Sequence, residues 1–217
     1  MTPKFTVEDF RNEDAEAVAQ LRRAAVAYLV CTAESVTWDA CSAPADKRTK
    51  WMVAREPGGR IAGCADAGLF SESTETGMAF LHTAVRPDVL GHGAGDALVA
   101  AGEGYLAGLG VRRVHTWVSD DGRSPGFAER RGYQRGRRAC FLGLDLTSGK
   151  LPDLPATLPA GVRLHTSADF TADRRPLYEA DLECAADEPG DVRAGFVSYE
   201  NWLRLNWERP DVDHHLS

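Results

Sequence analysis

Three glycines at alternate positions are the residues of this chain whose type and spacing most directly suggest chemistry. Gly91, Gly93 and Gly95 follow an apolar run, residues 78–85, and precede a run with helical character, residues 96–109. Glycine adopts positive φ readily and lets another molecule approach the backbone amides closely. The first turn of a helix adds unpaired N–H groups and a partial positive charge. The spacing therefore predicts an anion site suited to a pyrophosphate.

Two common phosphate loops do not fit the residues around these glycines. The stretch lacks the Gly-Lys-Ser/Thr ending of a P-loop, which argues against NTP hydrolysis. The even spacing differs from Gly-x-Gly-x-x-Gly, and the next expected strand, residues 111–118, offers no acidic residue to bind a ribose. What remains is a strand, a Val-x-Pro and a glycine-rich turn that opens a helix.

This pattern resembles the acyl-CoA loop of the GNAT superfamily of N-acetyltransferases, which is written Arg/Gln-x-x-Gly-x-Gly/Ala. The glycines match, whereas Leu90 stands where the family has Arg or Gln. A second segment, residues 121–133, resembles the family's Asn-x-x-Ala-x-x-Phe-Tyr-Glu-Lys-x-Gly-Phe. Phe127 keeps the Phe of that signature, and Ala128 replaces its Tyr. The two motifs occur in the family's order, and the resemblance covers about residues 5–146.

The resemblance implies an acetyl-CoA site built from both segments. A backbone amide of the motif strand, for which we favour Val85, would polarise the thioester carbonyl. The pyrophosphate would meet the amides of residues 90–95. Asp121 and Ser124 would either bond the pantetheine or cap the turn that follows them. The residues expected to contact the cofactor are Ala84, Val85, Leu90, Gly91, His92, Gly93, Ala94, Gly95, Asp121, Ser124 and Phe127.

Acetyl transfer to an amine also requires a base, because an ammonium ion is not a nucleophile. His82 lies on the motif strand and is the candidate base, with a purely structural histidine as the alternative. The acid that the family uses, a Tyr, is absent at Ala128. Glu34 is interpreted either as a ligand for a cationic acceptor or as a solvated surface acid. The resemblance places the acceptor pocket near Tyr28, Glu34 and Trp38.

Composition limits the class of protein. The chain has 217 residues, 43% of them hydrophobic, and a net charge of −7, which is typical of a globular protein and disfavours a nucleic-acid partner. No apolar run reaches membrane-spanning length and no signal pattern is present, so we expect a cytoplasmic protein without a membrane partner. The five cysteines form no Cys-x-x-Cys, and we expect no metal. The excess of Arg over Lys, with abundant Ala and Gly, indicates a bacterial source.

The order of the predicted elements is that of an α/β (α+β) GNAT fold. We expect a mixed, mostly antiparallel sheet of about six or seven strands, flanked by helices and splayed at the acyl-CoA site. The predicted strands are residues 5–10, 51–55, 61–69, 78–85, 111–118 and 140–146, and the predicted helices begin near residue 12 and cover 35–41 and 96–109.

The last third of the chain is predicted to be a separate unit. We divide the chain into an acyl-CoA-binding domain (residues 1–147), a Pro-rich linker (148–160) and a partial second β-α-α segment (161–217). The tail is expected to begin with a strand over 161–166 and to continue with helices over 168–185 and 198–207. It resembles the start of the second half of a tandem GNAT protein. Such a tail would pack on the first domain, pair with another chain as in a homodimer, or be the remnant of a longer parent.

The leading hypothesis is therefore an acetyl-CoA-dependent N-acetyltransferase acting on a primary amine of a small molecule or peptide. The alternative is a non-catalytic acyl-CoA-binding or regulatory module, which the missing Tyr at Ala128 and the incomplete second half favour.

Overall fold

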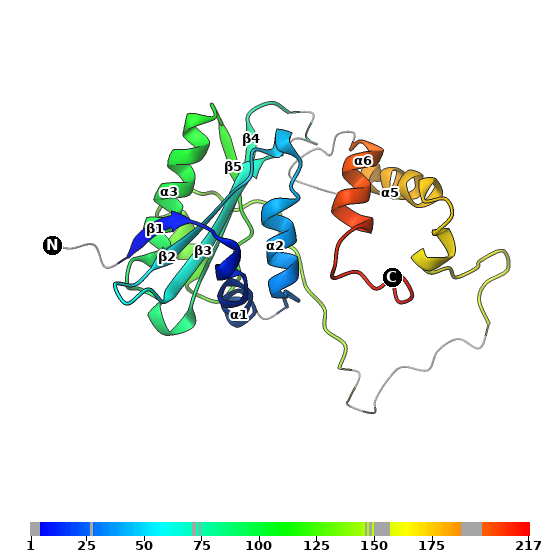
Figure 1. The fold of residues 1–217 in the computed structure, drawn as a ribbon, viewed down its shortest axis with the longest axis horizontal. Coiled ribbons are helices and arrows are strands. Elements are labelled where there is room, and N and C mark those ends of the chain that lie inside the picture. The colour runs from blue at the N-terminus through cyan, green and yellow to red at the C-terminus, as the bar shows by residue number, and fades with distance from the viewer. Residues whose placement is uncertain are drawn as a thin grey trace.

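The computed structural model describes residues 5–26, 28–70, 73, 75–145, 147, 149, 157–187 and 197–217 (Figure 1). One mixed sheet of five strands organises the first two thirds of the chain, in the order β1-β2-β3-β4-β5. The first three pairings are antiparallel and the last is parallel. The strands are β1 (Thr6–Asp9), β2 (Lys50–Arg55), β3 (Ile61–Leu69), β4 (Met78–Val85) and β5 (Arg113–His115).

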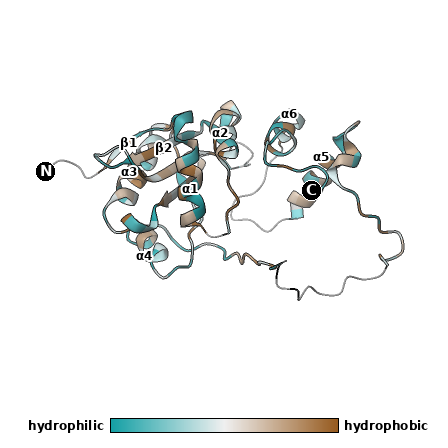
Figure 2. Ribbon diagram, turned by 60° about the horizontal axis from the view of Figure 1, so that its bottom comes forward, coloured by the Kyte–Doolittle hydropathy of each residue, from teal (hydrophilic) through white to brown (hydrophobic). Residues whose placement is uncertain are grey.

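Two helices, α1 (Ala15–Ala25) and α2 (Ala33–Cys41), cover one face of the sheet. α1 is amphipathic, since apolar residues spaced three or four apart are buried while the other side stays polar (Figure 2). Thr32 caps α2 by accepting a hydrogen bond from the Ser35 N–H at 3.1 Å. The buried carboxylate of Asp14, just before α1, receives a 2.5 Å bond from Arg55 of β2. The Asp14–Arg55 contact ties the start of α1 to the sheet, and Val36 of α2 belongs to the buried cluster that includes Val53 of β2.

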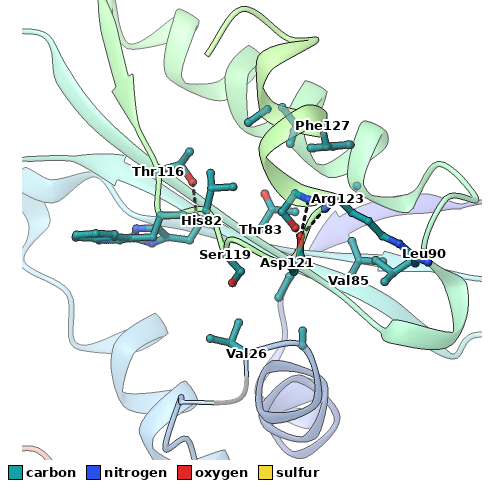
Figure 3. Close-up of a pocket in the computed structure, with 18 of the residues that line it drawn as sticks. Val26, His82, Thr83, Val85, Leu90, Thr116, Ser119, Asp121, Arg123 and Phe127 are labelled. Carbon is teal, nitrogen blue, oxygen red and sulfur yellow. Dashed lines mark hydrogen bonds between the residues drawn. The ribbon is translucent and has the colours of Figure 1, made fainter. Parts of the chain in front are cut away.

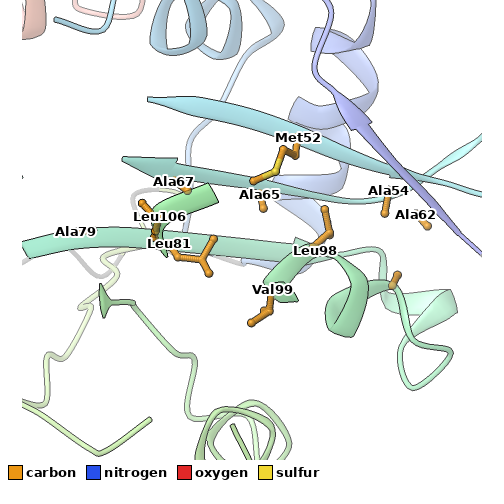
Figure 4. Packing of buried hydrophobic residues seen from close by; sticks show 11 residues of the cluster. Met52, Ala54, Ala62, Ala65, Ala67, Ala79, Leu81, Leu98, Val99 and Leu106 are labelled. Carbon is orange, nitrogen blue, oxygen red and sulfur yellow. The ribbon is translucent and has the colours of Figure 1, made fainter. Parts of the chain in front are cut away.

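The opposite face is covered by α3 (Ala94–Gly108), whose small residues allow close packing. A Cβ on Gly102 would lie 2.5 Å from Leu81 Cδ1, and a Cβ on Gly63 would lie 2.8 Å from Leu98 Cδ1. Glycine at both positions lets the helix backbone approach the sheet closely. Figure 4 shows Leu98 and Leu106 of α3 beside the central strands, whose alanines belong to the same buried cluster.

The sheet has five strands among the described residues, fewer than the six or seven expected. The strand predicted over 140–146 does not form across the described residues 140–145, which are exposed and pair with no strand. Its alternating apolar residues suggested a strand, but a strand requires a neighbour to satisfy its backbone groups. Phe141 instead stacks on Tyr28, with ring centroids 3.8 Å apart.

β5 is also shorter than the predicted 111–118, and this shortening creates the expected splay. Only Arg113–His115 is a strand, and it pairs with β4 over Met78–Phe80. β4 continues to Val85 while β5 has already ended. The two strands therefore share three residues and leave the second half of β4 open on that side.

The tail is helical, and the strand predicted over 161–166 is absent. It contains a 3-10 turn (Ser167–Phe170), α5 (Arg175–Asp187), α6 (Tyr199–Trp202) and a π-helical turn (Leu203–Trp207). The helix predicted over 168–185 therefore begins later, and the helix predicted over 198–207 changes its winding after Trp202. Ser198 caps α6 through the Asn201 N–H, as its sequence position suggests. Most of the predicted linker, 148–160, lies outside the described residues.

The tail has a small aromatic cluster and one ionic contact with the first domain. Tyr178 and Trp202 are buried against each other, and the Trp202 indole N–H donates to Asp181 at 2.7 Å. Arg209 reaches Asp39 on α2 at 2.7 Å, which brings the tail beside that helix (Figure 1). No helix in the described part of the chain is long and apolar enough to cross a membrane.

The positions of the cysteines predict that the exposed thiols react in the native protein and the buried thiols react only after unfolding. Cys41, Cys140 and Cys184 are exposed, whereas Cys31 and Cys64 are buried, and burial raises the pKa of Cys64 to about 12. Only a thiolate attacks common thiol reagents. At mildly alkaline pH the native protein should react at three cysteines and, once unfolded, at five. Mass spectrometry of the labelled peptides checks the sites, and rapid native labelling of Cys64 would contradict the packing of β3 under α1.

Candidate active site

A cleft of about 1310 Å³ opens where β4 and β5 separate. It exceeds the roughly 300–1,000 Å³ of most small-molecule sites, which suits an elongated ligand. Figure 3 shows Val85 and Leu90 at one end and His82 with Thr116 at the other. The walls come from α1, β4, the start of α3, the segment after β5, and α4 (Ser124–Glu129).

The backbone of β4 presents unshared donors to this cleft. The Arg86 N–H bonds Ala62 O of the β3 side at 2.8 Å. Alternate residues of an antiparallel strand bond the same neighbour, so the intervening Val85 N–H points away from β3. β5 ends before reaching that level, and this amide therefore faces the cleft. Thr83, on the same side of β4, has a buried Oγ1 with no partner among the described residues.

The glycine loop has the conformation that its sequence predicts. Gly91 and Gly93 have φ of 79° and 98°, which other residues adopt only with strain. Gly93 is the N-cap of α3 and has no side chain, so it gives the helix no side-chain cap hydrogen bond. The first N–H groups of α3 are therefore free toward the cleft, where Gly93, Ala94 and Gly95 line the wall. The exposed His92 turns back, its Nδ1 lying 3.2 Å from the Val89 carbonyl.

Arg86 holds the loop where it leaves β4. Its Nη1 donates to the Ile61 carbonyl at 2.6 Å and its Nη2 to Glu56 at 3.2 Å. Its Nε donates to Asp88 at 2.5 Å, and this hydrogen bond lowers the pKa of that carboxyl. The loop is thus tied to the β2–β3 hairpin by one guanidinium group.

The second motif forms the opposite wall, and Asp121 caps it. The Asp121 carboxylate accepts from the N–H groups of Arg123 and Ser124 at 2.8 and 2.7 Å, and from the Ser124 hydroxyl at 2.8 Å. Burial alone would raise the pKa of Asp121, but these hydrogen bonds outweigh it and lower the pKa. These hydrogen bonds fit the turn-capping role of Asp121 and Ser124, and their contact with pantetheine stays a prediction.

Phe127 fastens α4 to the start of α3. A Cβ on Gly95 would lie 3.2 Å from the Phe127 ring, so the two helices touch there. The Arg131 guanidinium lies 3.7 Å from the centre of the same ring and pairs with Asp96. Asp96 is in the first turn of α3, where its charge would repel a bound anion. Arg131 offsets that charge.

His82 contacts Asp66, an acid that was not predicted from the sequence to be part of the site. Its Nδ1 lies 3.0 Å from Asp66 Oδ2, and the two residues are register partners on β4 and β3. The His82 side chain is 38% exposed and that of Asp66 is 14% exposed. Both line the cleft on the α1 side of the sheet, together with Arg22. The available signal was a lone acid in an otherwise apolar strand, Ile61–Leu69.

The three predicted acceptor residues separate in the structure. Tyr28 lines the cleft, where it stacks on Phe141. Glu34 and Trp38 lie on α2 and are not among the lining residues. Asp66, Arg86, Arg131 and Phe141 are site-forming residues that sequence reasoning missed, because each acts through a partner distant in the chain.

Two further side-chain features limit the chemistry. Tyr133 lines the cleft near the place of the missing family Tyr, but its hydroxyl donates to Glu103 at 2.9 Å. Burial, and then this hydrogen bond, raise the pKa of Tyr133, which makes it a weaker proton donor. Within the described ranges there is no group of three or more His, Cys, Asp or Glu side chains able to hold a metal ion.

The chain belongs to the GNAT acetyltransferase family, a family of acyltransferases: residues 15–133 match its model, described as Acetyltransferase (GNAT) family. A GCN5-related N-acetyltransferase from Sphaerobacter thermophilus is similar with a TM-score of 0.61 and 20% identity, over 96% of this chain and 64% of that one. An acetyltransferase of Trypanosoma brucei is similar with a TM-score of 0.51 and 22% identity, over 64% of this chain and 99% of that one.

A third similar structure was solved with a ligand. An aminoglycoside N-acetyltransferase in complex with CoA has a TM-score of 0.51 and 19% identity, over 64% of this chain and 94% of that one. At these identities the similarity establishes a common fold. No curated protein matches the chain.

The Asp121 cap predicts a local, pH-dependent stabilisation. Asp121→Ala removes three hydrogen bonds to the start of α4 and should lower the free energy of unfolding by about 0.5–2 kcal/mol in urea titrations at neutral pH. Because the folded pKa is lowered, the advantage of the wild type is present above about pH 3.9 and is lost as the pH falls through the folded value.

The neighbouring acid supplies the control. Asp120 is 73% exposed and forms an ion pair with the exposed Arg138. Asp120→Ala should change the free energy of unfolding by less than about 0.5 kcal/mol. Equal effects of the two substitutions would contradict the capping role.

Proposed function

We propose that this protein is an acetyl-CoA-dependent N-acetyltransferase that acts on a primary amine of a small molecule or peptide. One observation carries the proposal: the free N–H of Val85 and the open N-terminus of α3 face the same cleft. Acyl transfer from CoA needs a donor for the developing oxyanion and a binding site for the pyrophosphate, among other groups.

The described residues fit acetyl-CoA in extended form. The pyrophosphate would lie on the amides of residues 90–95, with the pantetheine along the open edge of β4. Thr83 supports this placement, because a buried hydroxyl without a partner is satisfied if a ligand bonds it. Bound there, acetyl-CoA supplies the acyl group as a thioester, whose carbonyl oxygen the Val85 N–H would polarise.

The chain must also remove a proton from the acceptor. His82 is our candidate base, since it lies in the cleft on the α1 face and is partly open to solvent. The imidazole takes a proton from the substrate ammonium. The amine nitrogen then attacks the thioester carbonyl and forms a C–N bond, the C–S bond breaks, and the sulfur leaves with the electron pair. The nitrogen, which is positively charged after the attack, loses its second proton to water and becomes the amide.

The leaving group does not need an acid from the protein. Ala128 has no proton to give, and the Tyr133 hydroxyl is committed to Glu103. The thiol of a cysteine has a pKa of about 8.5, far below that of an alcohol, so a thiolate departs far more readily than an alkoxide and would take its proton from water. The absence of the family Tyr is therefore compatible with turnover.

We also infer that residues 161–217 serve as an appendage of the first domain rather than as a second catalytic unit. No strand or glycine loop occurs among the described residues of this segment, and Arg209 joins it to Asp39. The five cysteines are free, which supports a cytoplasmic location.

A glutamate in the loop tests the proposed pyrophosphate site. Gly93→Glu adds a negative charge and a side chain at a residue with φ of 98°, and should abolish acetyl-CoA binding in calorimetry. Gly104→Glu is the matched control, because it adds the same group at an exposed position of the same helix where a Cβ meets no atom within 4 Å. It should bind normally. Undiminished affinity of folded Gly93→Glu would reject this site.

Replacing His82 tests the proposed base. His82→Ala should lower kcat by about 10²-fold or more at neutral pH, because general-base catalysis typically contributes that much. Release of free CoA thiol against an amine panel measures kcat, and calorimetry should show unchanged acetyl-CoA affinity. An unchanged kcat would make His82 structural. Tight binding by the wild type with no turnover of any amine would favour the non-catalytic module.

A further inference from the structure

Asp66 occupies an unusual place for a carboxylate. It lies in the middle of β3, in the sequence IAGCADAGL, where it is the one charged residue of the strand. Its side chain is 14% exposed, and His82 is the one side chain to which the described structure gives it a hydrogen bond. A largely buried acid with a single partner has its position fixed by that partner and fixes the partner in turn.

The groups near this pair are a cation, a thiol and an aromatic ring. Arg22 of α1 lines the same cleft, and its guanidinium lies 5.2 Å from the ring centre of Trp51. Cys64, two residues along β3, stays a neutral thiol because burial raises its pKa to about 12. Phe80 of β4 stacks on the His82 ring at 5.3 Å, with 20° between the planes. The imidazole is therefore held by a ring on one side and a carboxylate at Nδ1.

We propose that Asp66 is a positioning residue that fixes the tautomer and orientation of His82 for proton removal from the acceptor amine; this inference rests on the proposed acetyltransferase function. An ionised carboxylate can only accept a hydrogen bond, so the imidazole Nδ1 must carry the hydrogen that Asp66 binds. Nε2 then carries the lone pair. A base aligned by a third group is the arrangement by which side-chain nucleophiles and bases are generally activated.

The proton taken from the substrate goes to His82 and then to water, and Asp66 is not protonated. Nε2 takes one proton from the substrate ammonium, which gives an imidazolium with hydrogens on both ring nitrogens. Asp66 keeps its negative charge and stabilises the imidazolium through the existing Nδ1–H bond. The exposed side of His82 returns the proton to water once the acetylated product has formed.

The test uses Asp66→Asn, whose amide can donate to Nδ1 and so favours the opposite tautomer, with hydrogen on Nε2. We expect kcat to fall by roughly tenfold or more while the affinity for acetyl-CoA is unchanged. Nitrogen NMR of the imidazole should show hydrogen on Nδ1 in the wild type and on Nε2 in the variant. In a double variant with His82→Ala, Asp66→Asn should cause no further loss.

The chain offers a matched control pair. His165 and Asp169 form the same imidazole–carboxylate contact at 3.1 Å, far from the cleft in sequence and exposed on the tail. Asp169→Asn should leave kcat unchanged. Asp66→Glu, which keeps the carboxylate, should recover part of the activity lost in Asp66→Asn.

The outcomes distinguish a failure of the Asp66 role from a failure of the proposed acetyltransferase function. An active wild type in which Asp66→Asn keeps full kcat, or in which His82 carries its hydrogen on Nε2, overturns the role of Asp66. If the wild type acetylates no amine, the proposed function fails, and the NMR tautomer still shows whether Asp66 controls the imidazole. Should Asp66→Asn not fold, the wild-type spectrum alone decides, because hydrogen on Nε2 would overturn the inference.

Discussion

The site depends on the register in which β3 pairs with β4. That register places Asp66 opposite His82 and Gly63 opposite Val85. Because side chains alternate along a strand, His82 faces α1 while Val85 faces α3, and because hydrogen bonds alternate too, the Val85 N–H points away from β3. A slip of one residue would move every one of these groups to the wrong side. In the proposed mechanism, a single strand pairing therefore sets both proton removal and carbonyl polarisation.

Because β5 ends early, the Val85 N–H that points away from β3 has no strand to bond. Had β5 continued along β4, the outward amide of Val85 would have been used in a sheet hydrogen bond. Instead the ladder ends at Phe80 and His115, and the donor remains available beside the free N–H groups of α3. Unbonded backbone donors are costly when buried, and an open cleft lets water or a ligand satisfy them. The site therefore exists because β5 is too short to pair with the second half of β4.

Local patterns were predictable, and pairings between distant residues were not. The glycine loop, the hairpin of residues 51–69 and the motif strand are encoded by neighbours in sequence. Asp66 could not be assigned to His82, because their contact requires the register across sixteen positions. The segment 140–145 has the alternation of a strand, but alternation does not supply a partner strand. Glu34 and Trp38 were placed by the resemblance alone, and the packing of α2 keeps them away from the cleft.

The two departures from the family pattern, Leu90 and Ala128, lie at positions where backbone amides or water could replace the missing side chain. In the proposed mechanism, Leu90 replaces a side chain in a loop that would bind the anion through its amides. Ala128 replaces a proton donor to a sulfur that water would protonate. Deprotonation of the acceptor is different, because no backbone group accepts a proton near neutral pH. In the proposed mechanism that step alone requires an ionisable side chain. His82, the one imidazole among the described residues that line the cleft, would carry it out, aligned by the Asp66 carboxylate.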